Sequence, residues 1–564
     1  MSRYLLALIT LTFAVFAQGT NGTIAGQITD QAGASIANAK VLIQNEASGV
    51  NREASSNANG QYVAYALPPG QYKITVEQAG FQKLVRTAIA LTAADAITVD
   101  LRLAIGDVRQ TIEVSEAAPL LQSQTAMVSS LVTNDQMIEM PLKSRTFTSL
   151  VLLGPGAYAG SAGNLTSSPY AMRGDVNISV NGSSPQNNSY FIDGMVNRNL
   201  WLSTLIMVPT VDSIQEMRVL TSNYSAEYGI AAGAVTIVQT RSGTNRFRAS
   251  AYEFLRNSAL DANQFFNNRL GVAKPAFRRN EFGGTVGGPI RKDRTFFFAD
   301  YQGIRVAQPR SSISTIATLA QREMVATGNF AALGTQVFDP TTLTGTLRTP
   351  FPGNLIPRTR LDPAAGKLFA LLPDPTSPAA NRNFAYNPTQ RQSTDQFDVR
   401  LDQNVGSADR LFFKYSWDNT SLVIPGFIPV RPGASLDQNP YLAADGTYTA
   451  TDTPLRNQSA TFNYVKVFTP SLINETRLGA VRWNQNIEPL GNPFSTATAL
   501  GIPGVNTNDK SGGLPAFTMT GFSGLGDNST YPEVSRTTSF QYENVMTWTR
   551  GAHTLKGFFA VSCG

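Results

Sequence analysis

The sequence contains very few of the residues on which many sites depend. Cys563 is its only cysteine and His553 its only histidine. An intrachain disulfide is therefore excluded, and a zinc peptidase, which needs histidine and carboxylate ligands, is not expected. Charged residues make up 15% of the chain, against about 25% in ordinary soluble proteins. Lysine and arginine are scattered and form no stripe with interleaved aromatic residues, so nucleic acid is not an expected partner.

Motifs of catalysis are also missing. The sequence has no metal-ligand cluster and no GxSxG elbow in a strand–helix setting. Two glycine pairs, Gly283-Gly284 and Gly287-Gly288, are not followed by the Lys-Ser/Thr of a phosphate loop, and no helix is expected to begin there. We interpret them as glycines of strands. The sequence therefore predicts no enzyme, no catalytic residue, no bound metal and no cofactor.

One apolar run stands at the start of the chain, in MSRYLLALITLTFAVFAQG. Arg3 supplies a positive charge before the apolar run Tyr4 to Phe16, and small residues precede Gln18. The run is shorter than the ~20 residues of a spanning helix, so it predicts a cleavable signal peptide over residues 1–17. The alternative is a buried helix. No later segment is a candidate spanning helix, so we expect an exported protein, in the periplasm, outside the cell or in an outer membrane as a β-barrel.

Residues 22–103 alternate short β-prone segments with turns rich in Gly, Pro and Asn. This spacing predicts a β-sandwich. The expected strands are 23–30, 39–45, 61–65, 71–77 and 97–101. The aromatic residues on them are expected to be packed in the core rather than exposed as a platform for sugars; they are Tyr62, Tyr65, Tyr72 and Phe81.

The stretches GQITDQAGASIANAKVLI and NANGQYVAYALPPGQYKITVEQAGF resemble the carboxypeptidase regulatory-like domain. Folds of this type also resemble starch-binding modules. The resemblance implies a β-sandwich and no peptidase activity. Carbohydrate binding by this domain stays open as an alternative to a structural role.

Residues 108–243 have a different pattern, with RTFTSLVLLGPGAY, SVNGSSPQNNSYFIDGMV and SNYSAEYG in order. Asn134 or Asp135 is expected to cap a short helix that Pro141 terminates. The stretches resemble the plug domain of TonB-dependent outer-membrane receptors, in the Oar-like branch. The resemblance implies a small α/β domain inside a wide barrel.

Two candidate sites lie in this region. Polar loop residues are candidates to face a substrate, because side-chain amides suit sugars or peptides, although they suit solvated loops equally well; they are Asn181, Gln186, Asn187 and Asn188. Asp193-Gly194 is expected to form a tight turn, not a catalytic site. The resemblance also implies a TonB box, a short segment that adds as a strand to the inner-membrane TonB protein. Our candidate is Thr111, Ile112, Glu113, Val114 and Ser115. The alternative for it is a last strand of the sandwich.

Residues 244–564 alternate apolar and polar side chains. Phe397, Val399 and Leu401 alternate with Asp398, Arg400 and Asp402, as expected for strands with one lipid-facing and one lumen-facing row. The same pattern recurs at 411–418 and 540–549, and the alternation predicts about nine strands. Stretches such as NEFGGTVGGPI and TFFFADYQGIR resemble the first strands of an Oar-like barrel, and plugged barrels have ~22 strands. The resemblance therefore implies a C-terminally truncated barrel.

These patterns together predict a mainly β protein of the outer membrane: a sandwich, an α/β plug and the first part of an antiparallel transmembrane barrel. The resemblance implies energy-coupled transport, with outer-membrane lipid and the TonB complex as partners and a small molecule, carbohydrate or peptide as ligand. The alternative function is a surface carbohydrate-binding module that a barrel anchors.

Overall fold

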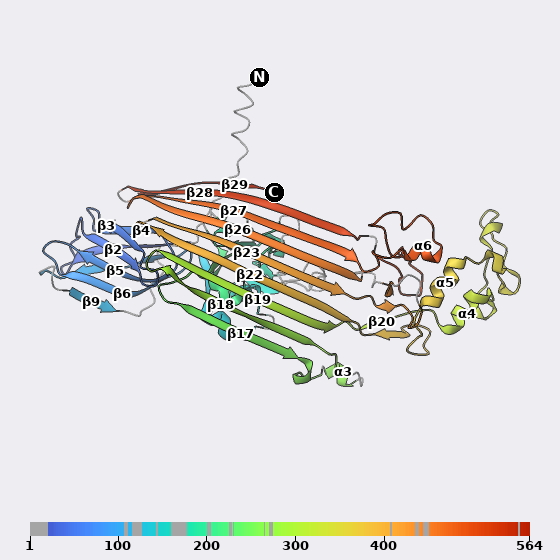
Figure 1. The fold of residues 1–564 in the computed structure, drawn as a ribbon. Coiled ribbons are helices and arrows are strands. Elements are labelled where there is room, and N and C mark those ends of the chain that lie inside the picture. The colour runs from blue at the N-terminus through green and yellow to red at the C-terminus, as the bar shows by residue number, and fades with distance from the viewer. Residues whose placement is uncertain are drawn as a thin grey trace, which may run out of the picture.

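The computed structural model describes residues 21–106, 111–115, 127–142, 145–159, 178–199, 205–224, 228, 231–263, 265–269, 274–406, 409–434, 439–443, 450–528, 530–550 and 553–564. The predicted signal peptide lies outside these residues. The described chain forms a sandwich at one end, an inner domain, and a long sheet that continues into a cap at the other end (Figure 1). Within the described residues, no helix has the length and apolar character needed to cross a membrane.

The sandwich has two sheets, with strand orders β4-β1-β7 (β8 also pairs with β1) and β3-β2-β5-β6-β9. Their bounds are β1 (Gly22–Asp30), β2 (Lys40–Asn45), β3 (Asn51–Ser55), β4 (Gln61–Leu67), β5 (Gly70–Glu77), β6 (Lys83–Leu91), β7 (Ala96–Thr98), β8 (Leu101–Leu103) and β9 (Thr111–Ser115). The buried core between the sheets comes from the sandwich's own strands and includes Ile28, Val41, Ile74 and Leu101. The predicted sandwich is therefore present.

Two strands of the sandwich, β3 and β6, were not predicted from the sequence. β3 is short and mostly polar, and it alternates buried Arg52 and Ala54 with exposed neighbours, so it lacks an apolar row. β6 contains Ala88 with a φ of 60°, and the pairing register with β5 shifts near this point. A bulge of this kind interrupts the two-residue period by which strands are recognised.

The inner domain has a five-stranded sheet in the order β10-β15-β16-β13-β14 and a separate β11-β12 pair. Its elements are β10 (Val128–Thr133), α2 (Asn134–Glu139), η1 (Phe147–Leu153), β11 (Ala157–Ala159), β12 (Ile178–Val180), η4 (Pro185–Asn187), β13 (Ser189–Ile192), β14 (Met195–Val196), η5 (Val211–Ser213), β15 (Ile214–Ser222) and β16 (Val235–Thr240). The expected helix before Pro141 is present. Its cap is Thr133, which forms a capping box with Gln136, and not Asn134 or Asp135 as expected.

The wall is a nine-stranded antiparallel sheet of described residues, in the order β17-β18-β19-β22-β23-β26-β27-β28-β29, as many strands as expected. Their bounds are β17 (Arg248–Asn257), β18 (Arg278–Arg291), β19 (Thr295–Pro309), β22 (Thr389–Val405), β23 (Asp409–Ile424), β26 (Thr451–Thr469), β27 (Leu472–Pro489), β28 (Glu533–Arg550) and β29 (His553–Cys563). Both glycine pairs of the sequence lie on β18, in agreement with their interpretation as strand glycines.

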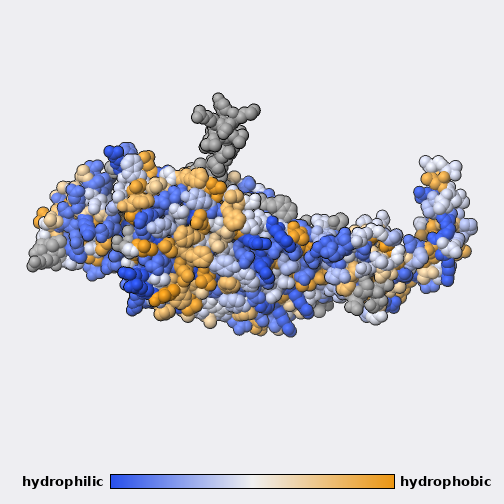
Figure 2. All heavy atoms as spheres, turned by 45° about the horizontal axis from the view of Figure 1, so that its top comes forward, coloured by the Kyte–Doolittle hydropathy of each residue, from blue (hydrophilic) through white to orange (hydrophobic). Residues whose placement is uncertain are grey.

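The predicted alternation is confirmed along the wall. On β22, Asp398, Arg400 and Asp402 are buried on the face toward the inner domain, whereas Val399 and Leu401 are exposed on the other face. Predicted apolar positions of β23 and β28 are exposed in the same way; they are Phe413, Phe540, Tyr542, Met546 and Trp548. Figure 2 shows apolar side chains gathered in a band over the body, with hydrophilic ones on both sides of it. This is the pattern of a lipid-facing surface.

Short turns join the wall strands beside the sandwich, and long segments join them at the opposite end (Figure 1). Three long segments, within 310–388, 425–450 and 490–532, form the cap. The cap contains β20 (Ser312–Ser314), α4 (Leu319–Thr327), α5 (Pro363–Leu371), β21 (Phe384–Tyr386), β24 (Ile428–Pro429), β25 (Tyr441–Ala443) and α6 (Thr496–Leu500); α3 (Phe265–Arg269) follows β17.

The three segments of the cap share one apolar core, whose residues include Ile316, Leu371, Leu442, Leu500 and Leu525. Backbone hydrogen bonds also join the segments, from Ser523 to Thr315 at 2.9 Å and from Gly526 to Leu442 at 2.7 Å. The long connection between β19 and β22 is therefore folded, because apolar residues far apart in the chain bury one another there.

Candidate functional site

The inner domain meets the wall at the turn Asp193-Gly194, between β13 and β14. Both residues have a positive φ, 50° for Asp193 and 87° for Gly194, so the predicted tight turn is confirmed. Asp tolerates this left-handed conformation better than most residues, and Gly adopts it freely. A side chain at Gly194 would begin about 3.0 Å from Arg477 Nε of β27, so this turn lies directly against the wall.

The Asp193 carboxylate joins the inner domain to two wall strands. It is 1% exposed, and it accepts hydrogen bonds from Thr240 N at 2.9 Å and Thr240 Oγ1 at 2.7 Å. Arg400 Nη1 of β22 lies 3.3 Å away and Lys414 Nζ of β23 lies 3.4 Å away. Burial alone would raise the pKa of Asp193, but Lys414, Arg400 and the Thr240 hydrogen bonds hold it below its ordinary value. The carboxylate is thus a buried anion between two cations.

The cations are themselves balanced on the wall. Arg400 contacts Asp402 through two nitrogen–oxygen distances of 3.0 Å, and Arg410 contacts Asp402 at 2.9 Å. Lys414 Nζ also lies 3.6 Å from Asp398. We call this set the anchor cluster; its members are Asp193, Asp398, Arg400, Asp402, Arg410 and Lys414. Each buried charge in it has an opposite charge beside it, as burial in a low dielectric requires.

Further polar contacts hold the inner domain elsewhere along the wall. Arg145 of the inner domain pairs with Asp212 at 2.6 Å and with Glu281 of β18 at 3.2 Å. The backbone of Val196 exchanges two hydrogen bonds with the side-chain amide of Gln541 on β28, at 2.8 and 3.0 Å. The inner domain therefore contacts strands from the first to the last part of the sheet.

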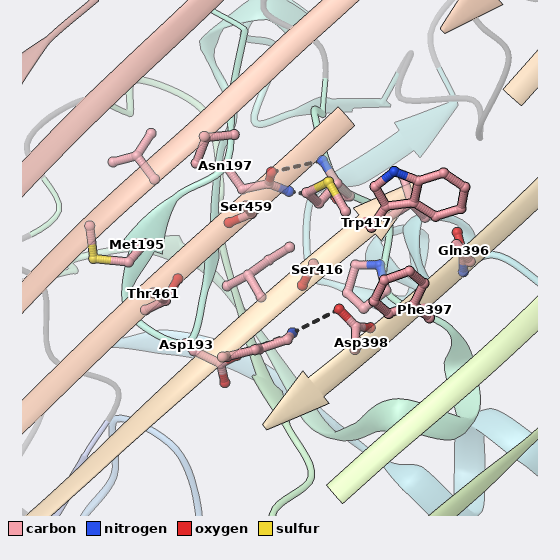
Figure 3. Close-up of a pocket in the computed structure, with 17 residues that line it drawn as sticks. Asp193, Met195, Asn197, Gln396, Phe397, Asp398, Ser416, Trp417, Ser459 and Thr461 are labelled. Carbon is pink, nitrogen blue, oxygen red and sulfur yellow. Dashed lines mark hydrogen bonds and ion pairs between the residues drawn. The ribbon is translucent and has the colours of Figure 1, made fainter. Parts of the chain in front are cut away.

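A cavity of about 20 Å³ lies beside the anchor cluster (Figure 3). Figure 3 shows Asp398, Ser416, Ser459 and Thr461 of the wall around it, opposite Asp193 of the inner domain. A cavity of this size holds about one water molecule. It is too small to be a substrate pocket, so this region functions as a contact between the inner domain and the wall.

The four candidate substrate-facing residues differ in their exposure to solvent. Asn181, Gln186 and Asn187 are exposed, with Asn181 Nδ2 donating to Thr221 O at 2.6 Å. Asn188 is 1% exposed, and its amide donates to Ile178 O at 2.7 Å and accepts from Ala234 N at 2.8 Å. The prediction for Asn188 is therefore wrong, since both amide atoms hold the base of the loop. The other three stay predictions.

The candidate TonB box is strand β9, the edge strand of the sandwich's larger sheet. It pairs in parallel with β6, from Lys83–Thr111 to Thr87–Ser115. Ile112 is 37% exposed, and Val114 packs partly against the sandwich core. In the structure the segment is therefore the last strand of the sandwich, which was the alternative interpretation. The edge of β9 that faces away from β6 has no partner strand among the described residues.

The aromatic residues of the sandwich are mostly core residues, as predicted. Tyr62 and Tyr72 are buried, and their hydroxyls donate to Val99 O at 2.7 Å and Pro68 O at 2.5 Å. Phe81 packs on the same core. Tyr65 was predicted wrongly, because its hydroxyl lies 2.6 Å from Thr554 Oγ1 on the wall. These four side chains do not form a platform for a sugar.

One sandwich loop is packed against the inner domain. The N–H of Ala93 donates a hydrogen bond to Glu216 Oε1 of β15. Arg218 of the same strand donates to Thr92 Oγ1 at 2.5 Å and lies 3.4 Å from Asp95. Burial raises the pKa of Glu216 to about 7, and Asp95 adds to this, whereas the Ala93 hydrogen bond and Arg218 oppose it. A carboxyl group that ionises near neutral pH therefore lies in this contact.

Sequence patterns did not single out the wall residues of the anchor cluster as a site. A signal was present: charges of opposite sign alternate at every second residue in Asp398, Arg400 and Asp402, which places them on one face of a strand. Within the described part of the chain, His, Cys, Asp and Glu residues form no group of three or more that could hold a metal ion.

Replacing Asp193 by Asn is expected to weaken the hold of the wall on the inner domain. Asn tolerates the left-handed turn, and its one amide oxygen can still accept from Thr240 N, so the change removes the charge and one of the two acceptor oxygens. We expect a loss of about 1.5–3 kcal/mol, the usual contribution of a hydrogen bond to a charged group. Limited proteolysis in detergent should cleave residues 178–240 faster. The exposed control Gln186→Ala should leave the rate unchanged, and equal rates for both variants would contradict the role of Asp193.

The contact of the sandwich with Glu216 is expected to weaken as pH rises. The folded pKa, about 7, lies above the ordinary value of 4.5. The stabilisation is therefore complete below pH 4.5 and is lost as pH rises through 7. Spin labels can be attached to Glu53→Cys of the sandwich and Lys292→Cys of the wall in a chain with Cys563→Ser. The distribution of distances between the two labels should be broader at pH 8 than at pH 5. Glu216→Gln should stay narrow throughout; broadening in that variant too would assign the change to another group.

Comparisons with known proteins agree with this architecture. Residues 239–558 match the outer membrane beta barrel domain, and residues 23–104 match the carboxypeptidase regulatory-like domain. The chain is 26% identical over 258 residues to the TonB-dependent transporter Oar of Myxococcus xanthus, a match over 44% of this chain and 23% of that protein. The chain thus matches about a quarter of the length of this curated relative.

Solved structures with similar arrangements include the siderophore receptor PirA of Acinetobacter baumannii, with 12% identity, a TM-score of 0.44, and coverage of 78% of this chain and 48% of that one. The outer membrane transporter YddB of Escherichia coli has 11% identity, a TM-score of 0.46, and coverage of 77% and 48%. The barrel domain match covers more than half of the chain, which therefore belongs to the outer membrane beta barrel domain family.

Proposed function

We propose that the chain is part of an energy-coupled transporter that takes a ligand inward across the outer membrane. The observation that carries the proposal is the position of the inner domain. It covers the polar face of the wall, is attached there by buried ion pairs, and lies between a folded cap and a sandwich with an exposed edge strand. Such a domain blocks passage until it is moved, and the cluster that holds it sets the resistance to movement.

In this proposal residues 108–243 are the plug and residues 244–564 belong to the barrel, with the apolar row of the wall in contact with outer-membrane lipid. Residues 1–17 act as a signal peptide that is removed before Gln18. The short turns lie on the periplasmic side with the sandwich, and the cap lies outside, in agreement with the usual asymmetry of outer-membrane barrels.

The ligand would first contact the cap and then the plug. Asn181, Gln186 and Asn187 supply exposed amide groups, which donate and accept hydrogen bonds and suit a polar small molecule, a carbohydrate or a peptide. The cap has a continuous core, so its three segments move as one body rather than as separate loops. Closure over a bound ligand would then be a single motion.

Energy would enter through β9. An incoming strand of TonB can pair with the free edge of β9 through backbone hydrogen bonds while β6 stays paired on the other side. From β9 the chain continues to β10, the outer strand of the plug sheet, which pairs with β15. A pull on β9 would therefore reach the edge of the plug sheet first.

Disulfide trapping tests this assignment. In a chain with Cys563→Ser, Ile112→Cys is expected to form disulfides with single cysteines on the pairing strand of the periplasmic domain of TonB. Glu53→Cys serves as a matched control, since Glu53 lies on β3, the opposite edge strand of the same sheet.

Adding Glu113→Pro to the Ile112→Cys chain should abolish trapping, because proline removes a backbone donor and fixes φ. Equal trapping at positions 112 and 53, or trapping that survives the proline, would show that β9 is not the site of coupling.

A further inference from the structure

A second and larger cavity lies where the sandwich, the inner domain and the wall meet. Its volume is about 290 Å³. The sandwich contributes the turns Asn45–Ser48 and Pro68–Gly70, the inner domain contributes Gln239 to Gly243, and the wall contributes Arg248, Thr285 and Phe298. The space suits a small polar solute with a few water molecules. We call it the junction cavity.

Three arginines line the junction cavity without a carboxylate partner. Within the described residues, no Asp or Glu oxygen lies within ion-pair distance of Arg241, Arg246 or Arg248. Arg241 Nη1 donates only to the backbone oxygen of Asp212, at 3.3 Å, while the Asp212 carboxylate is taken by Arg145. Guanidinium groups that have no ion-pair partner and line one space are suited to an oxyanion.

The other charges around the cavity do not balance these arginines. Arg400 and Arg410 also line it, but Asp193 and Asp402 already neutralise them. Asp135 is the one carboxylate among the lining residues. Three arginines without an ion-pair partner and one carboxylate therefore line the cavity, an excess of two positive charges; Arg246 and Arg248 are exposed and Arg241 is half-buried.

The pKa of Arg241 agrees with this charge distribution. Burial lowers the pKa of its guanidinium below the ordinary value and the positive charge of Arg248 lowers it further, while Asp212 and Asp135 act in the opposite direction. An anion between Arg241 and Arg248 would reduce the repulsion between them.

Gln239 restricts which anion fits the cavity. Its side chain lines the cavity and is 7% exposed, and its Oε1 is buried without a hydrogen-bond partner. An amide oxygen needs a donor. A fully ionised anion such as sulfate brings acceptors only, whereas a hydrogen phosphate or a phosphate monoester brings both acceptors for the arginines and a P–OH group that can donate to Gln239.

We propose that the junction cavity binds a phosphate group that retains a hydroxyl, with Arg241, Arg246 and Arg248 donating to its oxygens and Gln239 Oε1 accepting from its hydroxyl. The bound phosphate group would contact the inner domain and the wall, and the two turns of the sandwich would cover it. Free phosphate and a phosphorylated solute share this chemistry. A phospholipid diester has no P–OH group and is excluded.

Protection from phenylglyoxal, a reagent that modifies arginine, tests the proposal on the unaltered chain in detergent micelles. Inorganic phosphate should slow modification of Arg241 and Arg248, read by peptide mass spectrometry, while Arg256 serves as an internal control. Arg256 lies on the same strand as Arg248, at its other end, and pairs with Asp261 at 3.5 Å. Equal protection of all three arginines, or of none, would overturn the proposal.

Binding of inorganic phosphate by titration calorimetry gives the second arm. Arg241→Gln and Arg248→Gln should each weaken binding about tenfold or more, as expected for a charge-assisted hydrogen bond, and Arg256→Gln should not. Gln239→Leu should remove the preference for phosphate over sulfate. Equal binding of sulfate and phosphate to the unaltered chain, or protection by phosphatidylglycerol nanodiscs with none by phosphate, would contradict the proposed ligand.

Discussion

The position of the inner domain depends on one requirement, which is that the buried charges on the inner face of the wall must be neutralised. Every second residue of the wall strands faces the inner domain, and many of these residues are charged, such as Arg400, Asp402, Lys414 and Arg477. A charge buried without a partner costs several kcal/mol. Asp193 meets this requirement from the other side, because it brings one anion to Arg400 and Lys414. Two buried ion pairs of Asp193 thus attach the inner domain to the wall.

The same constraint explains the position of the other parts. Polar residues that line the inside of the wall need either the inner domain or water, so the domain covers them along the sheet while apolar residues occupy the outer face. The cap and the sandwich lie at the two ends of the wall (Figure 1). The cap has an apolar core of its own, and the sandwich contacts the inner domain through buried polar groups at Glu216 and Arg218. The junction cavity is the place where this balance of charges is left incomplete.

Much of the fold was predictable because its strands follow strict alternation. The rows around Val399 and Phe540 and the turn at Asp193 follow from periods and turn residues that act over a few positions. The cap was not predictable in this way, because its core joins apolar residues from three segments. The wall partners of Asp193 were missed for the same reason, because the contact of Asp193 with Arg400 joins residues 207 apart and no local pattern contains it. The burial of Asn188 was missed because it depends on contacts with Ile178 and with Ala234 of a neighbouring segment, which the local run of polar residues does not indicate.

The central claim is that Asp193 and Lys414 hold the inner domain to the wall through their charges. A double-mutant cycle with Asp193→Asn and Lys414→Met tests it most directly, with opening free energies of the β16 amides measured by hydrogen exchange. Contacting charges predict non-additive effects, with a coupling energy of about 1 kcal/mol or more. Effects that add to within about 0.5 kcal/mol would mean that the two residues act independently, and would contradict the account.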